Sequence, residues 1–201
     1  MATSREFGSL TDLGDKVAVG IDQSLTGFAF AVIDMEDPKK YYVNVYKSPY
    51  SGVRRLSDID NFLFEQMTEL SGKEIIDVAM EGTVLASNAA LVLGELSATV
   101  KLFFYEYFDG TNQVYPSAEP HLRTPLQIPP MTLKKYASGK GTSKKQEMLL
   151  QIYKRYGVEF NDDNAADAYA LARLAGGIVI DEIEQKVVEQ VQDPKYRDSL
   201  V

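Results

Sequence analysis

The stretch from Val17 to Val32, VAVGIDQSLTGFAFAV, constrains the fold of this chain more than any other. Two runs of small and β-branched apolar residues flank Gln23–Gly27, which has the composition of a tight turn. The pattern predicts a buried strand, a turn and a second strand that pairs antiparallel with the first. Asp22 ends the first run. Such a carboxylate either caps the turn from the surface or is paired with a cation, because burying an unpaired charge is costly.

The segment Glu74–Glu81, EIIDVAME, repeats this pattern and ends in a second acid. If its strand lies parallel to the first, Asp22 and Glu81 meet at one edge of the sheet, where α/β folds usually hold their sites. The same kind of patterning predicts further strands over 41–46 and 125–129 and helices over 56–70 and 87–107.

A third acid stands in the alanine-rich segment Asn161–Ala175, NDDNAADAYALARLA, which predicts a helix stopped by two glycines. Asp163 and Asp167 are four residues apart, and Asn164 and Asp167 are three apart, so each pair shares a helix face. Acids in a first helical turn are explained by the helix dipole. Asp167 lies deeper, between alanines that indicate close packing.

The chain has a net charge of −8, which argues against a nucleic-acid partner, but its basic residues are concentrated. Residues 131–158 contain seven basic side chains and one acid. The glycines and lysines of Gly139–Gln146 suit contact with phosphates, although a solvated basic loop explains them too. The Gly-x4-Gly-Lys spacing of a P-loop is missing.

The remaining features set bounds on the chain. Its 201 residues suit one domain, and the absence of cysteine excludes disulfides and thiolate metal sites. No apolar run reaches the roughly 20 residues of a membrane span, and residues 1–15 lack the apolar core of a signal peptide, so we expect a cytoplasmic protein with a mobile leader over 1–15. His121, in a proline-flanked loop, is expected to be a surface residue. The acidic extension over 177–201 could cover an apolar patch, extend a dimer or compete with DNA.

Five motifs follow one another in the chain. They are a Gly-Ile-Asp strand followed by Thr-Gly, a strand ending in Glu with Asn88 and Gly94 downstream, Pro-x-x-x-Lys-Lys, Gly-Lys-Gly-x-x-Lys-Lys-Gln, and an Ala-Asp-Ala helix. Each motif is weak, but their order and spacing resemble the RuvC family of Holliday junction resolvases, in a divergent, phage-type form. The resemblance covers roughly residues 16–176, which we take as one nuclease domain.

The resemblance implies an α/β protein with an RNase H-like fold, a mixed five-stranded sheet flanked by helices. It also implies a homodimer that resolves four-way DNA by paired symmetric nicks, in a bacterial or phage-infected cytoplasm. The metal-binding carboxylates of the family fall on Asp22, Glu81 and Asp167. Its fourth ligand falls on Asn164, which is a departure because an amide oxygen is a weaker ligand, and we favour a contribution from Asp163. The DNA-contacting residues fall on Lys134, Lys135, Lys140, Lys144 and Lys145.

Phosphodiester hydrolysis fits this assignment. Two divalent ions about 4 Å apart activate the attacking water and stabilise the leaving oxygen. Clustered carboxylates suit Mg²⁺, for which Mn²⁺ can substitute, and without metal their mutual repulsion raises at least one pKa.

Two alternatives stay open. One is an RNase H-like nuclease acting on other branched DNA or on RNA; the other is a junction-binding protein weakened in catalysis by Asn164. The cleavage sequence and the dimer surface, for which the helix over 87–107 is a guess, do not follow from the sequence.

Overall fold

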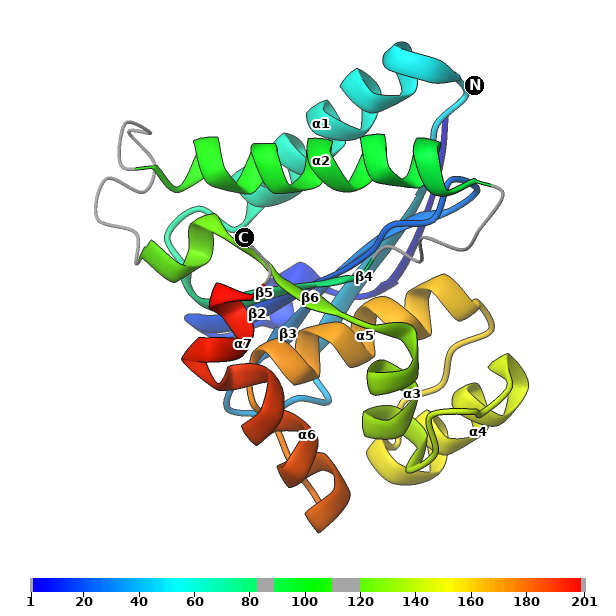
Figure 1. The fold of residues 1–201 in the computed structure, drawn as a ribbon, viewed down its shortest axis with the longest axis vertical. Helices are drawn as coiled ribbons and strands as arrows, with labels where there is room; N and C mark the ends of the chain where they lie inside the picture. Colours follow the sequence, from blue (N-terminus) through cyan, green and yellow to red (C-terminus); the bar gives the residue numbers. More distant parts are fainter. Residues whose placement is uncertain (1, 83–88, 110–119, 200–201) are drawn as a thin grey trace.

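The computed structural model describes residues 2–82, 89–109 and 120–199. Its centre is one mixed sheet with the strand order β1-β4-β3-β2-β5-β6 (Figure 1). The strands are β1 (Thr3–Gly8), β2 (Lys16–Asp22), β3 (Phe28–Asp34), β4 (Tyr41–Lys47), β5 (Glu74–Glu81) and β6 (Leu126–Ile128). The mixed α/β architecture is confirmed, with six strands in place of the five expected.

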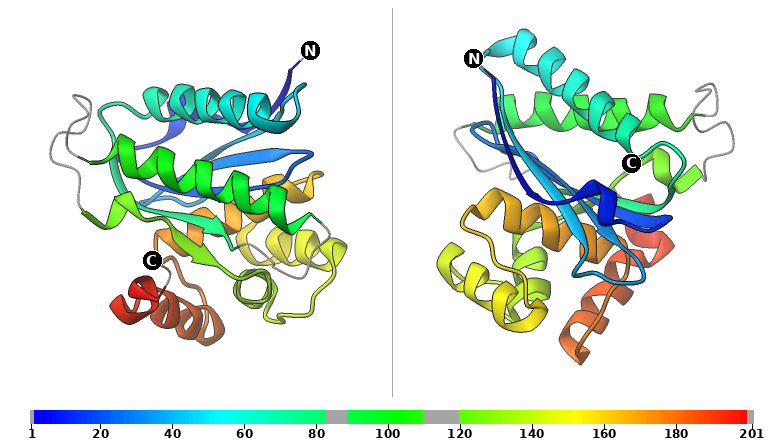
Figure 2. Two further views of the ribbon diagram at one scale, coloured as in Figure 1. Left: turned by 45° about the horizontal axis from the view of Figure 1, so that its top comes forward. Right: turned by 180° about the vertical axis from the view of Figure 1, so that it is seen from behind.

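Helices cover both faces of the sheet (Figures 1 and 2). On one face lie α1 (Gly52–Glu69) and α2 (Ala90–Tyr107). The other face carries α3 (Pro130–Ser138), α4 (Lys145–Tyr156), α5 (Asp163–Ala175), α6 (Glu182–Gln192) and α7 (Pro194–Asp198). Short 3-10 turns occur at Leu10–Asp12 and Pro120–Arg123. None of the helices in the described ranges combines the length and apolar character that crossing a bilayer requires.

The sheet register brings the ends of β2 and β5 together. β2 pairs antiparallel with β3, as the sequence predicts, and parallel with β5, which meets the condition set for Asp22 and Glu81 to lie together. Ile21 pairs with Met80, so the next residue of each strand, Asp22 and Glu81, lies at the same edge of the sheet.

Alternation along β2 explains why α5 lies against it. Val19 and Ile21 join the core under α1 and α2, so Gly20 and Asp22 face α5. A Cβ atom on Gly20 would lie 2.2 Å from the carbonyl oxygen of Ala168, because the α5 backbone rests directly on this glycine. The close approach holds the first turns of α5 over the edge of the sheet that carries Asp22.

At the chain ends one prediction is corrected and one choice left open by the sequence is narrowed. The mobile leader expected over 1–15 contains β1, which pairs antiparallel with β4 along its whole length. The acidic extension after Gly177 forms α6 and α7, and its Val187 and Val191 are buried in the core against α3. The extension therefore covers an apolar patch, one of the three roles considered for it.

The helix predicted from Ser87 begins at Ala90, and Ser87 and Asn88 lie outside the described residues.

Candidate active site

A cavity of about 360 Å³ opens at the edge of the sheet where β2 and β5 end. Its lining includes all three acids that the sequence singled out, together with turn residues after β2 and side chains from α2 to α5. The residues that line it are Asp22, Gln23, Ser24, Leu25, Thr26, Glu81, Leu93, Pro130, Lys134, Lys145, Met148, Asn164 and Asp167.

The three carboxylates are close enough to disturb one another's ionisation. Asp22 is 4% exposed, and its pKa is raised well above the ordinary value by burial, then by the charges of Glu81 and Asp167. Burial, followed by the charge of Glu81, raises the pKa of Asp167 to about 7. The pKa of Glu81 is raised by burial, while its hydrogen bond with Asp22 opposes that shift. Acids far apart in the chain thus form one cluster.

The structure separates the two candidates for the fourth position. Asn164 lines the cavity, and its amide nitrogen would lie 2.6 Å from a Cβ atom on Gly27, so the absence of a side chain there leaves room for it. Asp163 points to Lys145, with which it forms an ion pair that lowers the pKa of its carboxyl group. Asp163 does not line the cavity, so this placement favours Asn164 over the residue we had favoured.

Two of the five lysines predicted to contact DNA line the cavity, Lys134 from α3 and Lys145 from α4. The charges of both act on Glu81 and Asp167 and oppose the rise of their pKa values. The other three are exposed on α3 and the loop that follows it, and they do not line the cavity: Lys135, Lys140 and Lys144.

Gln23 is a site residue that the sequence reading treated only as part of a turn. It is 5% exposed, and its side-chain amide donates a hydrogen bond to the backbone carbonyl of Glu81, linking the ends of β2 and β5. Its buried Oε1 atom has no hydrogen-bond partner in the described part of the chain. Glutamine directly after the strand acid was the available signal, but composition alone does not distinguish it from a solvated turn residue.

The donor set fits a hard divalent cation in its chemistry. Carboxylate oxygens and amide oxygens are the ligands that Mg²⁺ takes in proteins, and the unpartnered Gln23 Oε1 adds a buried oxygen at the same cavity. Buried, mutually repelling acids also gain from a nearby positive charge. Among the described residues no three His, Cys, Asp or Glu side chains converge closely enough to hold an ion. The acids are therefore gathered but do not form a closed cage.

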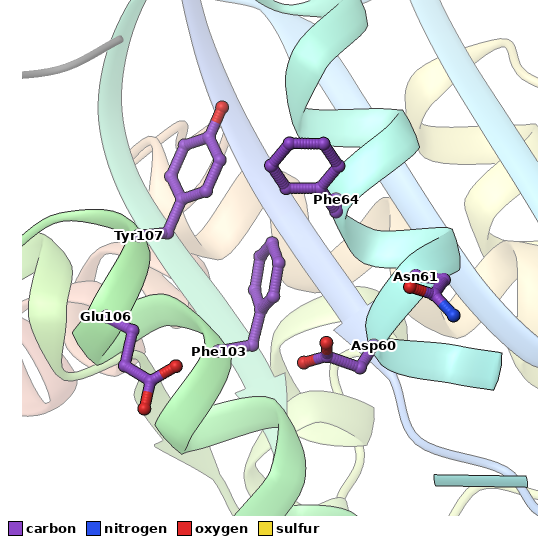
Figure 3. Close-up of a pocket in the computed structure, with 6 residues that line it drawn as sticks. All are labelled: Asp60, Asn61, Phe64, Phe103, Glu106 and Tyr107. Carbon is purple, nitrogen blue, oxygen red and sulfur yellow. The ribbon is translucent and has the colours of Figure 1, made fainter. Parts of the chain in front are cut away.

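Another cavity, of about 300 Å³, lies between α1 and α2 on the opposite face of the sheet (Figure 3). Aromatic rings and two acids line it: Asp60, Asn61, Phe64, Phe103, Glu106 and Tyr107. Its lining carries no cation, and the charge of Glu106 contributes to a raised pKa of Asp60. Such a lining repels phosphate, so the carboxylate cavity remains the candidate site. His121 lines neither cavity; its Nε2 atom lies 2.9 Å from the backbone oxygen of Ile76.

Comparison with known proteins supports the architecture. No family model matches the chain, and no curated protein is significantly similar to it in sequence. Among solved structures, Thermus thermophilus RuvC in complex with a Holliday junction substrate is 21% identical with a TM-score of 0.56, over 78% of this chain and 90% of that one. The chain has the RuvC fold. Another Thermus thermophilus RuvC structure is 18% identical, also with a TM-score of 0.56, over 88% of this chain and 97% of that one. RuvC-like architecture thus extends over most of the chain, as the sequence motifs predicted.

Proposed function

We propose that this chain is a divalent-metal-dependent endonuclease that resolves four-way DNA junctions by paired nicks. The observation that carries the proposal is the convergence of Asp22, Glu81 and Asp167 at one cavity flanked by Lys134 and Lys145, in a chain with the RuvC fold. Acids alone would repel a phosphodiester, and lysines alone would only bind it. A cavity that has both can hold a phosphate beside groups suited to a cation.

The residues that line the cavity have two roles in the proposed reaction, metal binding and phosphate binding. Asp22, Glu81, Asp167 and Asn164 would hold Mg²⁺, or Mn²⁺ in its place, in two positions. When bound, the ions supply an activated water and stabilise charge on the leaving oxygen. Lys134 and Lys145 bind the phosphates on either side of the bond to be cut.

Gln23 holds the end of β5 against the end of β2 through its hydrogen bond to the Glu81 carbonyl. Gly20 allows α5 to lie on β2, which keeps Asp167 facing Asp22. These two contacts keep the acids together against their mutual repulsion, because each fixes the backbone of an element that carries an acid.

Paired nicks on a symmetric junction need two active sites, and one chain offers one carboxylate cavity among its described residues. We therefore include a homodimer in the proposal, each protomer cutting one strand. The exposed apolar side chains of α2 offer a surface for it, since Leu91 is 80% and Leu102 is 56% exposed. Light scattering should give twice the chain mass, and Leu102→Glu should reduce it if α2 forms the contact.

Asn164 favours one other candidate function. An amide oxygen is a weaker ligand than the acidic or imidazole group that the family has at the fourth position, so the cavity would hold metal less tightly. A protein that binds junctions without cutting them does not need tight metal binding. Cleavage assays with Mg²⁺ on a synthetic four-way junction, a flap, a duplex and an RNA·DNA hybrid separate these functions. Symmetric nicks in the junction support resolution; cleavage of another substrate alone supports a different RNase H-like nuclease; binding without nicks supports the junction binder.

Substitutions of the three acids test whether cleavage takes place in this cavity. Asp22→Asn, Glu81→Gln and Asp167→Asn should each abolish cleavage and leave junction binding intact, because they remove charge from the acids without changing their size. Asp60→Asn, in the cavity between α1 and α2, is the matched control and should cut like the unmodified protein. Retained cleavage in any of the first three variants would show that catalysis does not depend on that acid and that the active site lies elsewhere.

A further inference from the structure

β1 adds a surface to the edge of the sheet that holds the carboxylates. The register pairs Thr3 with Lys47, so β1 begins where β4 ends. β4 ends beside the start of β3, where Ala29 pairs with Asp22. The first residues of β1 therefore lie at the same edge as the carboxylate cavity, with β4 and β3 between β1 and β2. Figures 1 and 2 show β1 running along the outside of the sheet.

A groove of about 200 Å³ lies between this corner and the start of α5. Thr26 and Asn164 line both the groove and the carboxylate cavity, so the two hollows adjoin each other. From the cavity the groove leads toward β1 and β4: its lining comes from these strands, the turn after β2 and the start of α5, and includes no residue of α3 or α4, which carry the lysines of the cavity. A chain of nucleotides passing through the cavity would find an open path in this direction.

The groove has a positive lining in an acidic protein. Arg5 and Lys47 line it against a single acid, Asp162. The Asp162 carboxylate caps α5, accepting hydrogen bonds from the backbone nitrogens of Asn164 at 3.0 Å and Ala165 at 3.2 Å. Its other oxygen forms an ion pair with Arg5 at 4.0 Å, so one acid faces two cations and the lining keeps a net positive charge.

Both cations are available to a ligand. The Arg5 side chain is 51% exposed; it forms an ion pair with Asp162 at 4.0 Å and donates one hydrogen bond, 2.5 Å long, to the side chain of Asn161. A guanidinium has five N–H donors, so several remain free for phosphate. Lys47 is exposed, and no ion-pair partner for it occurs in the described ranges. The hydroxyl of Thr3 adds a neutral donor along the same wall, whereas the hydroxyl of Ser4 donates to the side-chain oxygen of Asn44.

We propose that this groove binds the phosphate backbone of the DNA strand as it leaves the carboxylate cavity, with Arg5 and Lys47 each contacting a phosphate. The proposal rests on the proposed function and extends it to a strand that the five-stranded family sheet does not include. Cations then flank the acids on both sides: Lys134 and Lys145 on one, Arg5 and Lys47 on the other. Phosphates next to the reacting one are neutralised while the acids remain free for metal.

The test measures how junction binding depends on salt. Each phosphate contact that is lost should lower the slope of log affinity against log salt by about one. Binding of a labelled four-way junction is followed by fluorescence anisotropy with chelator present, between about 50 and about 200 mM salt. Arg5→Ala and Lys47→Ala should each reduce the slope by about one and the double variant by about two, while Lys47→Arg should keep it.

Lys39→Ala is the matched control, because Lys39 is exposed in the turn between β3 and β4 at the opposite edge of the sheet. It should leave the slope unchanged. Thermal melting of each variant checks that β1 still pairs. If the double variant folds and keeps the slope of the unmodified protein, the groove does not bind the DNA backbone. The proposed nuclease function is not affected by that result. An unmodified protein that binds no branched DNA overturns the proposed function first, which distinguishes the two failures.

Discussion

Asn164 and Asp163 are neighbours in one helical turn, yet their side chains lie in different surroundings. Asn164 faces the carboxylate cavity, whereas Asp163 binds Lys145. Asn164→Ala should weaken Mg²⁺ binding roughly tenfold or more, since it removes an oxygen from the cavity, and Asn164→Asp should strengthen it. Asp163→Ala should have a smaller effect. The rise in melting temperature with added Mg²⁺ measures this directly, and a larger loss in Asp163→Ala would reverse the assignment.

The acids also predict how stability depends on pH without metal. An acid whose pKa is raised on folding binds its proton more tightly in the folded state, so the free energy of unfolding falls as pH rises between the two pKa values. For Asp167 this window runs from the ordinary pKa of 3.8 to about 7. With chelator present, the protein should be less stable at about pH 8 than at about pH 5.

Asp167→Asn removes one of the titrating groups, so its stability should change less over the same pH range. Each unit of pKa shift corresponds to about 1.4 kcal/mol, which urea unfolding can resolve. Identical pH profiles for Asp167→Asn and the unmodified protein would contradict the raised pKa. Saturating Mg²⁺ should flatten both profiles, because a bound cation offsets the repulsion among the acids.

At the scale of elements, the sequence predicts those that have strong local patterns. β2, β5 and α5 follow from apolar runs and from helical spacing, and the antiparallel pairing of β2 with β3 follows from the turn after Asp22. The sequence leaves the parallel pairing of β2 with β5 open. β1 could not be predicted in this way. Its sequence TSREFG has no apolar alternation and five of its six residues are exposed, so only its pairing with β4 makes it a strand.

Gly20 is the position at which β2 and α5 depend most on each other. Gly20→Ala should lower the free energy of unfolding by about 1 to 3 kcal/mol. The added methyl would meet the α5 backbone and not a flexible side chain. It should also lower cleavage by moving Asp167 away from Asp22. Chemical unfolding checks the first effect.

Gly94→Ala in α2 is the matched control. Its new methyl would meet nothing within 4 Å, and alanine favours a helix over glycine by up to about 1 kcal/mol. This variant should therefore be as stable as the unmodified protein or more so. Equal stability of Gly20→Ala and the unmodified protein would mean that α5 does not rest on β2 as described.

At the scale of the whole molecule, the meeting of the three acids could be predicted from the sequence, but the surroundings of the acids could not. Strands ending in Asp22 and Glu81 converge if they are parallel neighbours, which is a topological inference. The choice between Asn164 and Asp163 depends on the rotation of α5 about its axis, and the partner of Gln23 depends on the distance between two strand ends. Both are set by long-range packing, which local sequence patterns do not encode.

The C-terminal segment shows the same dependence on long-range contacts, because an ion pair joins it to β5. Arg197 of α7 contacts Asp77 of β5 at 2.5 Å, and both side chains are mostly buried. The same guanidinium donates to the backbone carbonyls of His121 and Thr124, so it joins α7 to the segment that leads into β6. Burial raises the pKa of Asp77, and the charge of Arg197 opposes that shift.

Arg197→Ala should therefore destabilise the whole protein by roughly 3 kcal/mol, since it leaves the Asp77 carboxylate buried without its cation. Asp77→Asn in the same chain should recover part of the loss by removing that charge, whereas the two effects would simply add if the residues did not interact. Lys195→Ala, exposed on the same helix, should change little. A single unfolding transition shifted in Arg197→Ala would show that residues 177–199 fold as part of the domain; an unshifted one would show that α7 is dispensable to it.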